Sequence, residues 1–129
     1  MKSNNYQPKT INRTIAIVQR KEAFISWITE KLKAIDTNPT LPQVSGYDSK
    51  YTFLLPTLET STETDSYLQQ HCAKIIEFHV LQILGDEHKD LLPNNMDWQL
   101  FTSWFSYEAH SVIIDLDEQT DLSQDSWTY

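Results

Sequence analysis

Residues 14–19 most constrain what this chain can fold into, because the segment Thr-Ile-Ala-Ile-Val-Gln is apolar on both of its alternating faces. Side chains of a β-strand point alternately to opposite faces of a sheet. Ile15 and Ile17 would therefore lie on one face, and Ala16 and Val18 on the other. Two apolar faces are typical of a strand inside a sheet. The sequence therefore predicts a central strand at residues 14–19.

Periodic apolar residues and turn signals predict the other elements. Apolar residues three and four apart indicate helices, and short β-branched or aromatic runs indicate strands. The long central helix has a start signal, the capping-box sequence Thr60-Ser-Thr-Glu63, and a stop signal, Gly85. The expected elements after the first strand are a helix at 21–35, a strand at 51–55, a helix ending at Leu84, a turn at 86–93, a helix at 96–105 capped by Asn95, and a strand at 111–116.

The order of these elements, β-α-β-α-α-β, predicts an α+β fold: a two-layer domain with a three-stranded mixed sheet and three helices. A helical crossover joins the first two strands, so we expect these strands to be parallel if they share the sheet. The residues expected to be largely buried are Phe24, Trp27, Ile28, Leu68, Ile75, His79, Phe101 and Trp104.

Composition excludes several classes of site. The chain has 129 residues and only two glycines, Gly46 and Gly85. A Walker A loop and a dinucleotide-binding turn each need closely spaced glycines, so neither is present. The single cysteine, Cys72, excludes an intramolecular disulfide and a multi-cysteine zinc site. We therefore expect no cofactor of these kinds.

The ends of the chain are polar, and its charge is uneven. We expect residues 1–12 to form a flexible tail, residues 13–116 a single domain, and residues 117–129 an acidic tail. Residues 1–33 hold seven of the ten basic side chains and only two of the eighteen acidic ones. No apolar run is long enough for a signal peptide or a membrane span, and the lone cysteine suits a reducing compartment. These features predict a cytoplasmic protein.

Three blocks of residues have a distinctive order and spacing. They comprise residues 12–18 with Lys21, Phe24 and Trp27; residues 53–56 followed by the helix with Cys72; and Asp97-Trp98, Phe101, Trp104-Phe105, Tyr107, His110-Ser111 and Asp115-Leu116. This pattern resembles a family of small, uncharacterised bacterial proteins over residues 12–116. Family members tend to have Lys-Pro where this chain has Gln19-Arg20. The resemblance implies an α+β fold and a bacterial, cytosolic setting, and it brings no known activity.

Cys72 and His79 both lie in the apolar stripe of the long predicted helix. Seven residues of helical rise separate them by roughly 10 Å, which excludes a hydrogen-bonded nucleophile pair and direct ligation of one metal ion. We expect Cys72 to be a small core residue. For His79 we expect a buried neutral imidazole bonded to a backbone carbonyl or polar partner, and a catalytic role is the alternative.

Glu108 and His110 are two residues apart in the region that leads into the last predicted strand, so they would lie on one strand face. His110 and Ser111 would lie on opposite faces, which argues against a serine triad. A Glu108–His110 pair suits either a structural clamp at a helix–strand junction or a proton-transfer site. Lys21 follows the first strand and would lie at a similar level if the first and third strands pair.

Two acidic clusters have residue types that bind metals but lack the spacing. They are Asp86-Glu87-His88 with Asp90, and Asp115, Asp117 and Asp121. Neither matches a zinc-protease or EF-hand pattern, so we expect solvated charges and no metal.

These observations favour a non-enzymatic binding or adaptor domain. Three helices are too few to cover both faces of a sheet that has apolar residues on each face. An uncovered apolar face indicates a protein partner or a homodimer. A net charge of −8 argues against nucleic acid as a partner, because phosphates repel an acidic protein. The alternative is a small enzyme or small-ligand-binding protein that uses Glu108 and His110 with Lys21.

Overall fold

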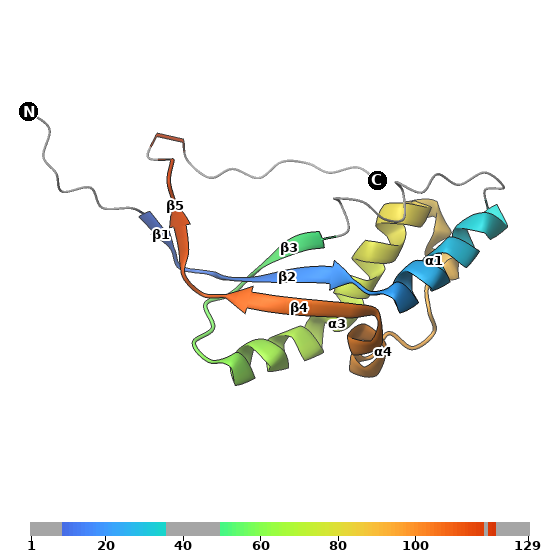
Figure 1. Cartoon of the computed structure of the whole chain (residues 1–129), viewed down its shortest axis with the longest axis horizontal. Helices are drawn as coiled ribbons and strands as arrows, with labels where there is room; N and C mark the ends of the chain where they lie inside the picture. Colours follow the sequence, from blue (N-terminus) through green and yellow to red (C-terminus); the bar gives the residue numbers. More distant parts are fainter. Residues whose placement is uncertain (1–8, 36–49, 118, 121–129) are drawn as a thin grey trace, which may run out of the picture.

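The computed structural model describes residues 9–35, 50–117 and 119–120. Within these residues the chain forms two small sheets and a set of helices (Figure 1). In chain order the elements are β1 (Lys9–Ile11), β2 (Thr14–Arg20), α1 (Glu22–Ile35), β3 (Lys50–Leu55), α3 (Ser61–Leu84), the 3₁₀ helix η2 (Asp86–Leu91), α4 (Trp98–Trp104), β4 (Phe105–His110) and β5 (Ile113–Asp115). The α+β class is confirmed.

The larger sheet has the order β3-β2-β4, so the predicted central position of β2 is confirmed. The prediction of parallel strands in a mixed sheet is wrong, because β2 pairs antiparallel with both neighbours. Lys50 at the start of β3 lies opposite Gln19 near the end of β2. The connection through α1 therefore brings the chain back to the end of the sheet where β2 finishes, and β3 runs in the opposite direction.

The third strand of this sheet differs from the predicted one. The predicted strand at 111–116 contains β5 (Ile113–Asp115), but β5 pairs in the second sheet. The strand beside β2 is β4 (Phe105–His110), which follows directly after α4. Phe105 and Tyr107 point to the core side of the sheet, where Phe105 is buried and Tyr107 is half-buried. The predicted third helix assigned Phe105 to its apolar stripe, because Phe101, Trp104 and Phe105 also fit helical spacing. Tertiary pairing with β2 decides in favour of a strand.

The predicted start and end of the long helix α3 are confirmed. The Thr60 hydroxyl accepts a hydrogen bond from the Glu63 backbone N–H, and the Glu63 carboxylate accepts one from the Thr60 N–H in return. Gly85, with φ of 97°, ends the helix in a conformation that favours glycine. The cap of α4 is Asp97, and not the predicted Asn95, because Asp97 accepts the N–H of Leu100. The predicted turn at 86–93 contains η2.

The helices and one face of the sheet enclose the core. Alternate residues of β2, namely Thr14, Ala16, Val18 and Arg20, are buried against α1, α3 and α4. The predicted core is confirmed, apart from Trp27, which is half-buried against Trp104 at a ring-centroid distance of 4.8 Å. Cys72 is buried as expected, and its pKa is raised by that burial.

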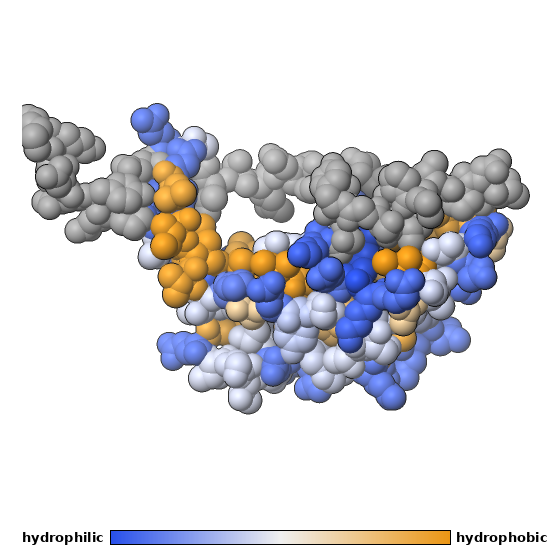
Figure 2. Space-filling view, in the orientation of Figure 1, coloured by the Kyte–Doolittle hydropathy of each residue, from blue (hydrophilic) through white to orange (hydrophobic). Residues whose placement is uncertain are grey.

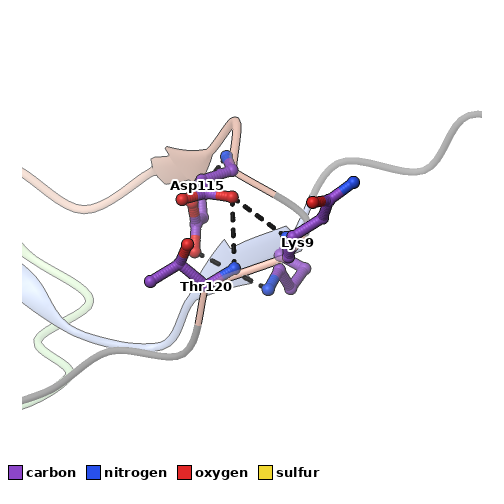
Figure 3. A network of polar contacts seen from close by, with 5 residues as sticks. Lys9, Asp115 and Thr120 are labelled. Carbon is purple, nitrogen blue, oxygen red and sulfur yellow. Dashed lines mark hydrogen bonds and ion pairs between the residues drawn. The ribbon is translucent and has the colours of Figure 1, made fainter.

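The second sheet is a two-stranded ribbon of β1 and β5, which pair antiparallel. Lys9–Ile11 form β1 although the predicted tail included them; residues 1–8 and 121–129 of the predicted tails lie outside the described residues. Figure 3 shows Lys9 beside Asp115 and Thr120, and the Lys9 Nζ–Asp115 Oδ2 distance is 3.8 Å. The carboxylate of Asp117 accepts the N–H groups of Gln119 and Thr120, which lowers the pKa of Asp117. These contacts hold the end of the ribbon.

Candidate functional site

Glu108 and His110 form a contact on the edge strand β4, as their spacing predicts. The distance between Glu108 Oε2 and His110 Nε2 is 3.0 Å. The two side chains are 65% and 50% exposed, so water screens the pair on most sides. His110 ends β4 and does not stand at a helix–strand junction, because α4 meets β4 at the other end of the strand. The predicted role of His110 in fixing that junction is therefore wrong.

A pocket of about 300 Å³ lies next to this pair, between the start of α3 and the end of β4. Its lining includes Thr60, Asp65, Tyr107, Glu108 and His110. The Tyr107 hydroxyl donates a hydrogen bond of 2.5 Å to Asp65. Partial burial, this hydrogen bond and the Asp65 charge together raise the pKa of Tyr107 to about 12. The pocket therefore combines acidic and hydroxyl groups with one imidazole.

Lys21 does not join this group. Its Nζ donates a hydrogen bond of 2.7 Å to the Thr102 carbonyl, and its backbone N–H donates to the Trp104 carbonyl. In the register of β2 and β4, Arg20 lies opposite Phe105, whereas Ile15 lies opposite His110. Six residues of extended chain, about 20 Å, thus separate Lys21 from Ile15, the residue opposite His110. The expectation that Lys21 lies level with His110 is wrong.

His79 is fully buried inside the domain and does not line this pocket. Its Nδ1 accepts a hydrogen bond of 3.0 Å from Nε of Arg20, which is the polar partner that the sequence predicts. Burial, and then the positive charge of Arg20, lower the pKa of His79 to about 3. The ring packs among Phe24, Tyr51 and Phe105. His79 is therefore a neutral core residue around neutral pH.

The two acidic clusters form no metal site among the described residues. Asp86, Glu87 and Asp90 are exposed, with Asp86 close to Lys89 and Glu87 close to His88. Asp121, the third acid of the other cluster, lies outside the described residues.

The outer face of the three-stranded sheet, opposite the helices, is the second candidate site. In the register of the sheet this face has three rows of side chains, each running from β3 through β2 to β4. The rows are Leu54–Ile15–His110, Thr52–Ile17–Glu108 and Lys50–Gln19–Ser106. Among the described residues no helix lies over this face, and its apolar centre consists of Ile15, Ile17 and Leu54.

The ribbon extends this apolar surface. Val112, Ile114 and Leu116 alternate along β5 and the residues that flank it, and they are 74%, 51% and 79% exposed. Figure 1 shows the ribbon rising from the sheet on the side away from α4. Figure 2 shows an apolar band that runs down the ribbon and continues onto the strands. We call the outer sheet face together with these three ribbon residues the open face.

The sequence predicts an uncovered apolar face but not the ribbon that enlarges it. The ribbon joins residues 9–11 to residues 113–115, and the polar residues around β1 obscured its strand signal. The β-branched pair Thr10-Ile11, which lies opposite Ile113-Ile114, was the available signal.

No protein-family model, no curated protein and no solved structure matches this chain. The resemblance to a family of uncharacterised bacterial proteins therefore gains no support from these comparisons. None of the helices between residues 9 and 120 that the structure describes is suited to crossing a bilayer.

Proposed function

We propose that this chain is a protein-binding domain and that the open face is its binding surface. The observation behind this proposal is the row of exposed apolar side chains that runs from the sheet onto the ribbon. Leu54, Val112, Ile114 and Leu116 are all more than half exposed. A contiguous apolar surface of this kind typically marks a protein contact.

The ribbon supports the proposal independently. A two-stranded ribbon by itself is marginally stable in water, because it has too little core to offset the cost of ordering its backbone. This ribbon has three-residue strands and apolar side chains on both sides: Ile11 and Ile113 on one, and Ile114 on the other. Contact with a partner at the open face would bury Ile114 and so stabilise the ribbon.

The test is site-specific photo-crosslinking in the cells that make the protein. A photoreactive amino acid replaces Ile17 in one variant, Leu54 in a second, and Gln69 in a control variant. Gln69 is exposed on α3, away from the open face. We expect adducts of the same mass from positions 17 and 54 and none from position 69. No adduct at either position on the open face, or equal adducts at all three, would contradict the proposal.

A second candidate is a small-ligand or enzyme site at the pocket beside Glu108 and His110, without Lys21. The specific observation in its favour is a pocket of about 300 Å³ next to an imidazole–carboxylate pair. Pockets that bind small molecules begin at about this volume. The test is His110→Gln, which keeps a hydrogen-bonding side chain and removes the titrating group. Unchanged melting together with loss of ligand binding or turnover supports this candidate.

The proposed setting is the cytoplasm of a bacterium. The free, buried thiol of Cys72 is compatible with a reducing compartment. The excess of eighteen acidic over ten basic side chains favours a protein partner over a nucleic acid.

A further inference from the structure

We infer that the protein bound at the open face is a second copy of this chain, packed face to face about a two-fold axis parallel to β2. This inference rests on the proposed function and names its partner. The reason is that this axis brings Ile15 and Ile17 against their own copies and brings Lys50 near Glu108 of the second copy.

The register of the sheet fixes which residues would meet. A two-fold axis along the central strand leaves β2 over its own copy and places β3 of each chain over β4 of the other. Ile15 would then meet Ile15 of the second copy, and Ile17 would meet Ile17. Face-to-face sheets of this kind are about 10 Å apart and nearly aligned, so side chains from both sheets interdigitate.

The charges of the outer face are on opposite edges. Lys50 is the cation of this face on β3, and Glu108 is its carboxylate on β4. The axis places β3 over β4, so each Lys50 approaches the Glu108 of the second copy from the neighbouring row. Their Cα atoms would be about 12 Å apart, a span that an extended lysine and an extended glutamate bridge together. Each dimer would contain this pair twice, since two-fold contacts are isologous.

The area of the open face indicates that the ribbon is part of the contact. Three strands about 4.8 Å apart and six residues long form a face of roughly 15 by 20 Å, or about 300 Å². Specific interfaces bury about 600 Å² or more on each partner, so the sheet face alone is too small. The ribbon projects on the same side as this face (Figure 1) and presents Val112, Ile114 and Leu116, which supply additional apolar area.

The test measures the dissociation constant of the dimer by sedimentation equilibrium, for the full chain and for charge-reversal variants of it. We expect a reversible dimer, and we expect Lys50→Glu and Glu108→Lys each to weaken it about tenfold, because each replaces two attractions with two repulsions. The double variant Lys50→Glu with Glu108→Lys restores both pairs with the charges exchanged, so its dissociation constant should return close to that of the wild type. Lys74→Glu, an exposed charge reversal on α3, is the matched control and should leave the dimer unchanged.

Ile17→Glu tests the apolar centre, because it would place two carboxylates on the axis, and we expect it to abolish the dimer. Circular dichroism checks that this variant folds; if it does not, the exposed charge variants still decide the question.

A monomer at every concentration overturns the inference, as does a dimer whose affinity none of these variants changes. A double variant that dimerises more weakly than either single variant overturns it as well. The proposed function survives that result if crosslinks at positions 17 and 54 contain a different protein, and fails if they contain none.

Discussion

Arg20 donates a hydrogen bond from Nε to Nδ1 of His79, and both side chains are buried. Arginine keeps its proton at all ordinary pH values. The accepting nitrogen of His79 must therefore stay unprotonated for this bond to exist. The side chains come from β2 and from α3, 59 residues apart in the chain, so the bond ties the central strand to the helix behind it.

This bond predicts a fall in stability on mild acidification. The pKa of His79 is about 3 in the folded chain and near 6.5 for an ordinary histidine. Between these values the unfolded chain binds a proton that the folded chain does not. The contribution of His79 is thus unchanged above about pH 6.5 and falls by up to about 1.4 kcal/mol for each pH unit below it. Urea unfolding at pH 7 and pH 5 measures the difference.

The variant His79→Gln should be less sensitive to acid, although its stability at pH 7 is lower because the buried site no longer fits. His71→Gln, at a half-buried position on the same helix, serves as the control. An equal loss of stability from pH 7 to pH 5 in the wild type and in His79→Gln would contradict the assignment.

We expect Tyr107 to lower the stability of the fold at alkaline pH, whereas His79 lowers it at acidic pH. Its pKa is about 12, and an ordinary tyrosine titrates near 10, so the folded chain retains a proton that the unfolded chain releases. Its stabilising contribution is complete below about pH 10 and is lost as the pH rises through 12. The phenolate absorbance of wild type minus that of Tyr107→Phe isolates this titration. Asp65→Asn should lower the pKa of Tyr107 but leave it above 10, because burial is the largest cause of the shift.

The capping box of α3 should contribute measurably to the free energy of unfolding. Thr60→Ala removes the acceptor for the Glu63 N–H and should lower the free energy of unfolding by about 1 kcal/mol. Thr62→Ala changes the same residue type two positions later, where the side chain is exposed and no cap depends on it. Denaturant unfolding of the two variants should therefore differ, and equal midpoints would show that the cap contributes nothing.

We expect the substitution Trp104→Ala in the core to cause a large loss of stability. Its ring lies 5.3 Å from that of Phe24 and 4.8 Å from that of Trp27, between centroids. Trp104→Ala removes this buried ring and leaves a cavity, so it should cost roughly 3–5 kcal/mol of unfolding free energy. The neighbouring exposed Ser103→Ala is the control. An unchanged melting temperature for Trp104→Ala would place this side chain outside the core.

The elements that the sequence predicts best are those with independent local signals. The two apolar faces of residues 14–19 specify a central strand, and Thr60, Glu63 and Gly85 specify both ends of α3. The direction of β3 has no such signal, because it depends on where the chain re-enters the sheet after α1. The start of β4 was ambiguous, since Phe105 fits the helical pattern before it and the strand pattern after it.

For the candidate site, the sequence predicts the local contact correctly but not the distance between residues on different strands. Contact between Glu108 and His110 follows from their spacing on one strand, so the sequence is sufficient to predict it. The distance from Lys21 to His110 depends on the register between β2 and β4, which join residues about ninety positions apart. Only the folded sheet specifies that register.

The position of β2 also bears on how the chain is made. β2 is synthesised well before its second neighbour, β4, which ends at His110. A growing polypeptide on the ribosome can pair β2 with β3 while the other side of β2 has no strand to bind. Pairings between distant segments also close slowly. Until translation reaches β4, the nascent chain therefore exposes an apolar strand edge, and this interval is when a chaperone or a misdirected strand would most readily bind it.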